Sequence, residues 1–96
     1  MSDVLKKAMA TDVPKVAMEY DQAELRLLVA ICRELQRAAG DEPFYLSART
    51  AGGLVSTHHA TTARWLRGLC VDEVLRLESK GERAGRKAST YRYLGD

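Results

Sequence analysis

The chain has 96 residues, of which 46% are hydrophobic and 29% charged, enough for one modest core but not for a catalytic cleft between two lobes. This composition excludes a disordered or collagen-like chain. The net charge of +2 is unevenly distributed, because residues 1–46 carry 6 Lys and Arg against 8 Asp and Glu, whereas residues 47–96 carry 9 against 5. The basic second half is therefore the candidate binding surface.

The sequence predicts neither a membrane span nor a secretion signal. No apolar run approaches the roughly 18 residues that cross a bilayer, and the N-terminus lacks the apolar centre of a signal peptide. We therefore expect a cytoplasmic protein without a membrane partner. Cys32 and Cys70 each lie in an apolar helical pattern, which favours buried reduced thiols over a disulfide.

Residues 1–20 are expected to form an N-terminal arm that precedes a domain over residues 21–96. Pro14 ends an amphipathic pattern over residues 3–10, which is too short for a stable isolated helix. The apolar residues of this pattern are Val4, Leu5, Ala8 and Met9. The arm could dock loosely, fray as many termini do, or contribute to dimerisation.

The first long helix is predicted from Asp21 to Gly40. Asp21 and Glu24 have the spacing of a capping box, and Gly40 is a suitable left-handed C-cap. Apolar residues recur between them at helical spacing: Leu25, Leu28, Val29, Cys32, Leu35 and Ala39. A second stripe of Leu27 and Ile31 widens the apolar face, so we expect a core helix that also forms a homodimer contact.

Two shorter helices follow a brief strand over residues 44–46. Ser47 is expected to cap a helix over 48–55, and a turn at 56–58 leads into a helix over 59–71. The residues expected to be buried are Ala51, Leu54 and Val55 in the first of these helices and Thr62, Leu66 and Leu69 in the second.

The last third of the chain predicts a β-hairpin. Residues 74–78 alternate charged and apolar side chains as a strand does, and residues 90–94 are the expected return strand. Between them, residues 79–89 hold two glycines and four basic residues, which predicts a positively charged hairpin tip. The order helix, strand, helix, helix, strand, strand is the winged-helix order, with residues 79–89 as the wing.

Several segments carry a resemblance to a known family: Ala51…Leu54-Val55, Thr61-Thr62-Ala63-Arg64-Trp65-Leu66-Arg67-Gly68-Leu69, and Val74-Leu75-Arg76-Leu77…Gly81. Through them, residues 21–94 resemble bacterial winged helix-turn-helix domains. The closing Ala88-Ser89-Thr90-Tyr91-Arg92-Tyr93-Leu94 is similar to the ends of such domains appended to plasmid- and phage-type primase–helicase replication proteins. The chain departs from the family in the turn, where the family usually has glycine, an apolar residue and serine and this chain has Ser56, Thr57 and His58. It departs again at Glu73 before the second strand, where the family often has glycine.

The resemblance implies an α+β winged helix-turn-helix fold, with a three-helix core, a small β-sheet and a β-hairpin wing. It also implies duplex DNA binding in replication or transcription control, with the third helix in the major groove and the wing on the DNA backbone.

Helical spacing selects the side chains that would contact DNA. If Thr62, Leu66 and Leu69 are buried, the opposite face of the third helix is basic and no acid occurs over residues 47–71. Arg64 is the candidate for a bidentate contact to guanine. The predicted DNA contacts are Arg49, His59, Thr61, Arg64, Arg67, Lys80, Arg83, Arg86 and Lys87, to which Ser47 and Thr90 could add phosphate hydrogen bonds. The alternative is that these residues form a solvated helix face and a soluble hairpin.

Other functions lack residues to support them. Adjacent His58 and His59 point in different directions with no cysteine close in sequence, so we expect no metal site. There is no glycine-rich phosphate loop, GxSxG elbow or carboxylate pair, so we expect no enzyme, cofactor or small-molecule substrate. Trp65, Tyr91 and Tyr93 could stack on single strands, but their spacing better fits residues that cover a core.

The competing hypothesis for the function is a winged-helix module for protein–protein interaction or dimerisation without DNA binding. In that case the long first helix and the N-terminal arm would form the contact. Binding through such an apolar surface would hardly depend on salt, whereas DNA binding would.

Overall fold

The chain forms an α+β arrangement of the elements α2 (Ala23–Ala39), β1 (Phe44–Tyr45), α3 (Ala48–Leu54), α4 (His59–Val71), β2 (Leu75–Ser79) and β3 (Thr90–Tyr93). The computed structural model describes residues 6–9, 17–18, 20–79 and 89–95, and residues 6–9 are also helical. The predicted elements from the first long helix onward occur in the predicted order with nearly the predicted bounds. The predicted α+β class is confirmed.

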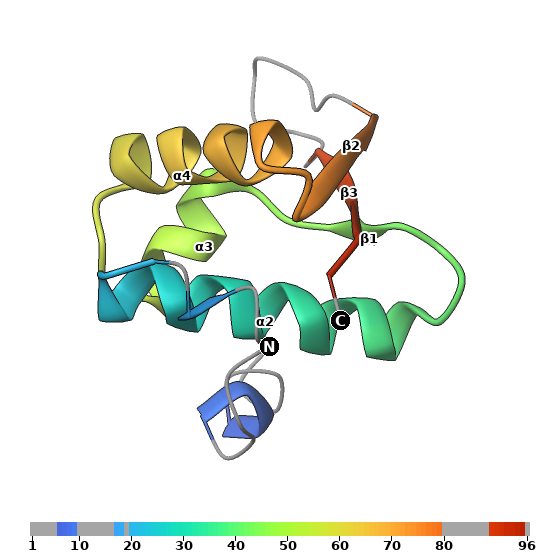
Figure 1. Ribbon diagram of the computed structural model, residues 1–96, viewed down its shortest axis with the longest axis horizontal. Coiled ribbons are helices and arrows are strands. Elements are labelled where there is room, and N and C mark those ends of the chain that lie inside the picture. Colours follow the sequence, from blue (N-terminus) through green and yellow to red (C-terminus); the bar gives the residue numbers. More distant parts are fainter. Residues whose placement is uncertain (1–5, 10–16, 19, 80–88, 96) are drawn as a thin grey trace.

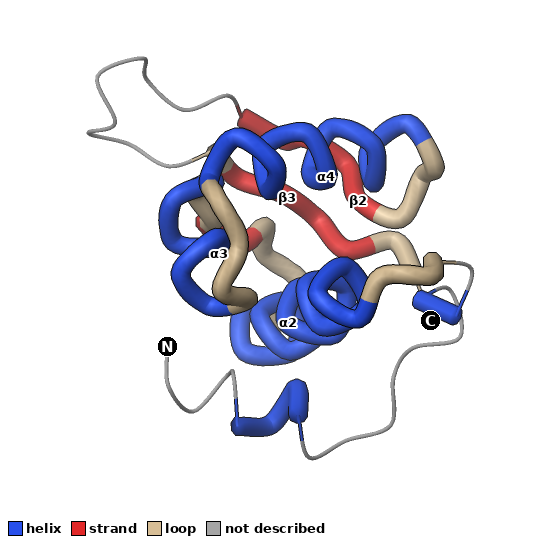
Figure 2. Tube along the Cα trace, turned by 90° about the vertical axis from the view of Figure 1, so that its left-hand side faces the viewer, coloured by secondary structure: helices blue, strands red, loops and turns tan. Residues whose placement is uncertain are grey.

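Helices α2 and α4 lie on opposite sides of the molecule, with α3 and the sheet between them (Figure 1). Seen from the side, α2 is nearly end-on below the strands and α4 lies above them (Figure 2). Helix α3 packs against α4, while β1 and β3 contact α2. One face of α4 is therefore directed inward and the other outward. None of the helices in the described part of the chain is long and apolar enough to cross a membrane.

The three strands form an antiparallel sheet in the order β1-β3-β2. Phe44 of β1 lies opposite Tyr91 of β3, and their rings lie 6.2 Å apart at an angle of 35°. Leu77 of β2 lies opposite the same Tyr91, with an irregularity in register before Ser79. The predicted pairing of the two hairpin strands is confirmed, whereas the predicted tip over residues 80–88 lies outside the described residues.

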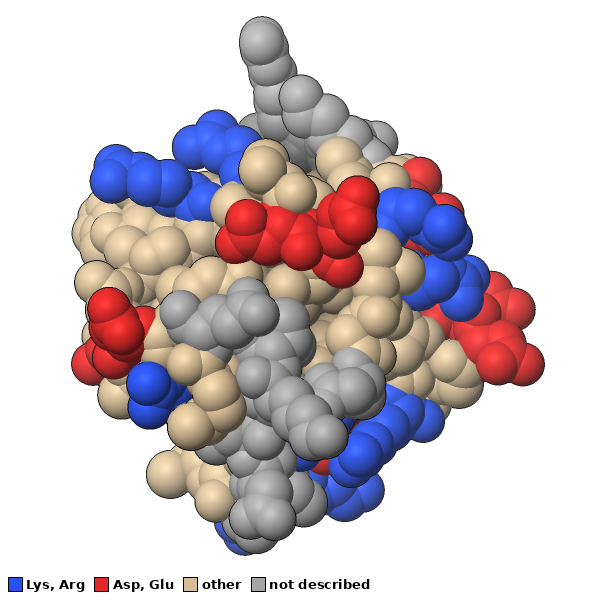
Figure 3. Space-filling view, in the orientation of Figure 1, with Lys and Arg blue, Asp and Glu red and all other residues tan. Residues whose placement is uncertain are grey.

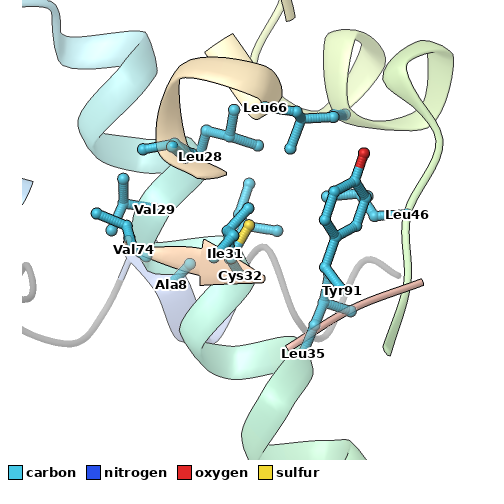
Figure 4. Packing of buried hydrophobic residues seen from close by; sticks show 14 of the residues in the cluster. Ala8, Leu28, Val29, Ile31, Cys32, Leu35, Leu46, Leu66, Val74 and Tyr91 are labelled. Atoms are coloured by element: carbon cyan, nitrogen blue, oxygen red, sulfur yellow. The ribbon is translucent and has the colours of Figure 1, made fainter. Parts of the chain in front are cut away.

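The core is centred on α2, which is buried on more than one side, as its broad apolar face predicts. Leu28 and Ile31 are fully buried, and burial of such a side chain stabilises a fold by about 1.5–3 kcal/mol. Residues from α2, α4, the sheet and the N-terminal segment meet in this core (Figure 4): Ala8, Leu28, Val29, Ile31, Cys32, Leu66, Val74 and Tyr91.

The start of α2 differs from the prediction. Its N-cap is Gln22, with no side-chain cap, so the capping box of Asp21 and Glu24 is wrong. Tertiary contacts hold this end instead, because Arg26 Nε donates to the Tyr20 carbonyl at 2.5 Å. The Tyr20 hydroxyl in turn donates to Asp72 at 2.7 Å, which ties the start of α2 to the residue after α4.

The end of α2 is at Gly40, as predicted. Gly40 has φ 66° and ψ −122°, a backbone conformation open to glycine but different from the left-handed helical one expected. Gln36 Nε2 donates to the carbonyls of Gly40 at 2.8 Å and Glu42 at 2.7 Å. These bonds satisfy carbonyls of the turn that follows the helix.

The second apolar stripe of α2 is largely covered within one chain. Ile31 is 0% exposed and Leu27 is half-buried. Ala8 and Ala17 belong to the same core, so the N-terminal segment docks on it, although Met9 is 69% exposed and not on the buried side as the pattern suggested. The homodimer stays a prediction, but this stripe no longer supports it.

Candidate nucleic-acid interface

Helix α3 is anchored at both ends by local hydrogen bonds. Ser47 is its N-cap, and the Ser47 hydroxyl accepts from the Thr50 amide at 3.1 Å, as predicted. Ala51 and the C-cap Val55 are buried, while Leu54 is only partly so. At the other end, the Thr57 amide donates to the Gly52 carbonyl at 2.8 Å. This bond spans Ser56, whose φ is 54°, and is the six-to-one bond of a Schellman cap.

The turn between α3 and α4 depends on a glycine. A Cβ atom at Gly52 would lie 2.5 Å from the Thr57 carbonyl oxygen, which is too close for any other residue without backbone movement. The Thr62 hydroxyl, which is 0% exposed, lies 2.8 Å from the Ala48 carbonyl and donates across to α3. These two contacts determine how α4 sits on α3.

Three buried side chains define the inner face of α4. Thr62, Leu66 and Leu69 are 0%, 2% and 1% exposed, which confirms the prediction from spacing. The outer face therefore carries Arg64 and Arg67, both exposed, with Thr61 half-buried. His59 is exposed too, but it precedes Thr62 by three residues and so lies on the side of the inner face, not opposite it as predicted. Arg49 is exposed on the first turn of α3, which packs against α4. The structure thus places these predicted contact residues on one pair of adjacent helices.

The charge along α4 changes sign at its C-terminal end. Asp72 and Glu73 follow the helix directly and are exposed. Figure 3 shows basic side chains where α4 lies, with acidic side chains towards its C-terminal end. The helix dipole adds positive potential at the N-terminus and negative potential at the C-terminus. An anion would therefore be attracted to the N-terminal part of α4 and repelled at its other end.

His58 and His59 form the start of α4. His58 Nδ1 accepts a hydrogen bond from the Ala60 amide at 3.1 Å and so caps the helix. The two rings stack with centroids 4.3 Å apart, so the expectation that the adjacent histidines point in different directions is wrong. Among the described residues no group of three potential metal ligands occurs.

The end of α4 is also a Schellman cap. The Val74 amide donates to Leu69 at 2.9 Å, and the Glu73 amide donates to Cys70 at 3.2 Å. Glu73 has φ 62°, and Ser56 is the other non-glycine residue with positive φ in the described part of the chain. Both residues stand where the resemblance predicts glycine, so both departures from the family occur where the backbone is strained.

Four predicted DNA contacts and the suggested phosphate contact Thr90 do not belong to this helix pair. Lys80, Arg83, Arg86 and Lys87 lie outside the described residues. Thr90 is only 7% exposed, which leaves little of it accessible to a phosphate.

The aromatic residues belong to the core, as their spacing indicates. Trp65 and Tyr93 are half-buried and pack against it, and Tyr91 is 9% exposed. Burial raises the pKa of Tyr91, which a side-chain hydrogen bond with Ser89 partly opposes. Tyr91 is therefore too buried to stack on a base, and Trp65 and Tyr93 contribute part of their surface to the core.

The two cysteines are free thiols. Burial raises the pKa of Cys32 to about 12, and partial burial raises the pKa of Cys70. Because the thiolate is the reactive form, burial makes both poor nucleophiles at neutral pH.

A hollow of about 380 Å³ lies between the C-terminal half of α2 and the end of β3, where Tyr93 and Gly95 line it. Its basic residues Arg33 and Arg37 lie 3.9 Å and 2.9 Å from the Glu34 carboxylate. Asp41 also lines the hollow. With its cations balanced in this way, the hollow does not favour an anionic ligand.

An arginine pair on the sheet was missed by the sequence reasoning. Arg76 Nε and Nη2 donate to Glu78 Oε1 at 2.8 Å and 2.7 Å, and Arg92 Nε donates to the same oxygen at 3.1 Å. These hydrogen bonds, Arg76 first, hold the pKa of Glu78 below its usual value. Alternation along a strand puts Arg76 and Glu78 on one face and could have revealed that pair, but Arg92 joins them only through the strand register.

No protein-family model, no curated protein and no solved structure matches this chain.

Proposed function

We propose that this chain is a winged helix-turn-helix domain that binds duplex DNA, with α4 in the major groove and the hairpin between β2 and β3 on the DNA backbone. The observation that carries the proposal is the burial of Thr62, Leu66 and Leu69, which directs Arg64 and Arg67 outward on a face without acids. The role is in replication or transcription control and involves no catalysis.

The chemistry of the outer face of α4 suits a DNA groove. The planar guanidinium of Arg64 matches the two acceptors of a guanine edge, and Arg67 supplies a second cation. Arg49 on the adjacent α3 is exposed and available to a phosphate, and the basic residues of segment 80–87 would supply further phosphate contacts in this proposal. The negative end of α4, with Asp72 and Glu73, supports an approach in which the part of the helix that carries Arg64 and Arg67 enters the groove and the C-terminal end stays away from the phosphates.

The test is the salt dependence of binding to a labelled duplex of mixed sequence, measured by fluorescence anisotropy. We expect a Kd on the order of 10⁻⁴–10⁻⁶ M at physiological salt. If about six phosphates are contacted, affinity should fall roughly a thousandfold between about 50 mM and 200 mM salt.

A matched pair of variants locates the contact. Arg64→Ala with Arg67→Ala should weaken binding and flatten the salt slope by up to about two units. Lys6→Ala with Lys7→Ala removes the same charge from the segment across α2 from α4 and should change binding much less (Figure 1). No binding even at low salt, or equal losses in the two variants, would contradict the proposal.

A further inference from the structure

Glu78 collects three hydrogen bonds from two arginines on one carboxylate oxygen. The donors are Arg76 Nε and Nη2 and Arg92 Nε, at 2.7–3.1 Å. Arg92 is also oriented by its Nη1, which donates to the Asp41 carbonyl at 2.7 Å. Two guanidinium groups are therefore held in place around a single oxyanion.

The cluster is accessible to solvent on the outer face of the sheet. Side-chain exposure is 59% for Arg76, 31% for Arg92 and 29% for Glu78, whereas Leu75 on the other face is buried. Exposed ion pairs contribute little net stability, so Glu78 can exchange for another anion at small cost. Among the three side chains themselves, two cations share one carboxylate.

The position of the cluster connects it with the proposed DNA surface. Strand β2 follows α4 and contacts it, and both arginines lie in the strands that flank residues 80–88. Basic and acidic side chains adjoin over the sheet, at right in Figure 3. The cluster therefore lies next in the chain to both parts of the proposed DNA surface.

We propose that Arg76 and Arg92 form a phosphate-binding site that Glu78 occupies in the free domain and that a DNA phosphodiester takes over on binding. A phosphate oxygen accepts the same charge-assisted N–H bonds as the carboxylate oxygen. The inference rests on the proposed function for the source of the phosphate, but the anion site itself does not depend on it. Glu78 would then lower the affinity for every duplex equally.

The site is tested first without DNA. Inorganic phosphate is titrated at constant ionic strength into the wild-type chain and into Glu78→Gln, and the arginine Nε–Hε signals are followed by NMR. In Glu78→Gln we expect saturable shifts of Arg76 and Arg92 at phosphate concentrations about fivefold lower or more than in the wild type, because the competing charge is gone. Arg67 is the internal control and should shift only weakly. The proposal is overturned if Arg76 and Arg92 shift no more than Arg67.

The second test uses the mixed duplex. Glu78→Gln should bind roughly threefold to tenfold more tightly than the wild type, whereas Glu24→Gln, which removes an exposed charge from the first turn of α2, should change binding less than twofold. The gain should vanish when Arg76→Gln and Arg92→Gln are added. Equal effects of the two glutamate variants, or a gain that survives without the arginines, would overturn the site while leaving the proposed function intact.

Failure of the proposed function has a different signature. In that case the wild-type chain binds no duplex, yet the phosphate titration still decides whether the anion site exists. Thermal unfolding of Glu78→Gln, followed by circular dichroism, checks that the variant is folded. If the variant is unfolded, the phosphate titration of the wild-type chain decides whether the anion site exists. In that titration the NMR signals of Arg76 and Arg92 should still shift more than the signal of Arg67.

Discussion

Ser56 and Glu73 are held in the left-handed region of the backbone, with φ of 54° and 62°. For a residue with a side chain this conformation costs about 1–2 kcal/mol, and glycine avoids most of it. Each residue follows a helix, at the one position where the chain must reverse within a Schellman cap. Polar side chains at these positions therefore reduce stability without altering the path of the backbone.

Ser56→Gly should raise the free energy of unfolding by about 0.5–1 kcal/mol, because relief of strain exceeds the extra entropy that glycine gives the unfolded chain. For a domain of this size that is a rise of a few degrees in Tm, measured by circular dichroism. Ala60→Gly, on the exposed surface of α4, is the control and should instead lower stability by about 1 kcal/mol. A Tm that falls in both variants would show that Ser56 is not strained.

Helices α3 and α4 are positioned on one another by contacts that leave little space. Gly52 allows the turn to fold back onto α3, and Thr62 bonds across to the Ala48 carbonyl at 2.8 Å. The proposed contact residues lie on the opposite side of α4, so their direction depends on this packing. A change at the α3–α4 contact would therefore alter both stability and the presentation of Arg64.

Gly52→Ala should lower the free energy of unfolding by about 1–3 kcal/mol, because its Cβ would overlap a backbone oxygen that cannot rotate away. Its neighbour provides the matched control. Gly53 lies in the same helix with no atom within 4 Å of an added Cβ, so Gly53→Ala should raise stability by about 0.5–1 kcal/mol. Urea denaturation measures both, and equal effects of the two substitutions would contradict the packing described here.

The whole molecule is organised around α2, which contacts the N-terminal segment, the helix pair and the sheet in one core. Because these parts share one core, we expect the domain to unfold as a unit. Cys32 lies within this core, is 0% exposed and has its pKa raised by burial to about 12. Its reactivity can therefore report on opening of the entire fold.

In a Cys70→Ser variant, labelling of Cys32 by a thiol reagent at about pH 8 should be slow and limited by global unfolding, since the thiol is both protonated and inaccessible in the native state. Low concentrations of urea should accelerate it in proportion to the unfolded population. Cys70 alone, in a Cys32→Ala variant, should react faster because it is only partly buried. Rapid labelling of Cys32 without urea would contradict a single cooperative core.

Much of the architecture follows from local patterns in the sequence. Helical spacing predicted the bounds of α4 and its buried residues Thr62, Leu66 and Leu69, because a helix that covers a core must repeat apolar side chains every three to four residues. Turn and cap residues predicted Ser47 as the N-cap of α3 and Gly40 as the end of α2. Outward exposure of Arg64 and Arg67 followed from the same spacing.

Other features depended on residues that are distant along the chain and were decided only by tertiary structure. The N-cap of α2 is Gln22 and not Asp21, and Tyr20 just before it is held by Arg26 and by Asp72, which lies 52 residues away from Tyr20. Ile31, expected at a dimer contact, is buried within one chain because α2 is enclosed on several sides. The Arg76–Glu78–Arg92 cluster formed because the register of β2 and β3 sets Arg76 opposite Arg92. Periodicity reports which face of an element is apolar, but only packing determines what covers that face and which charges meet across strands.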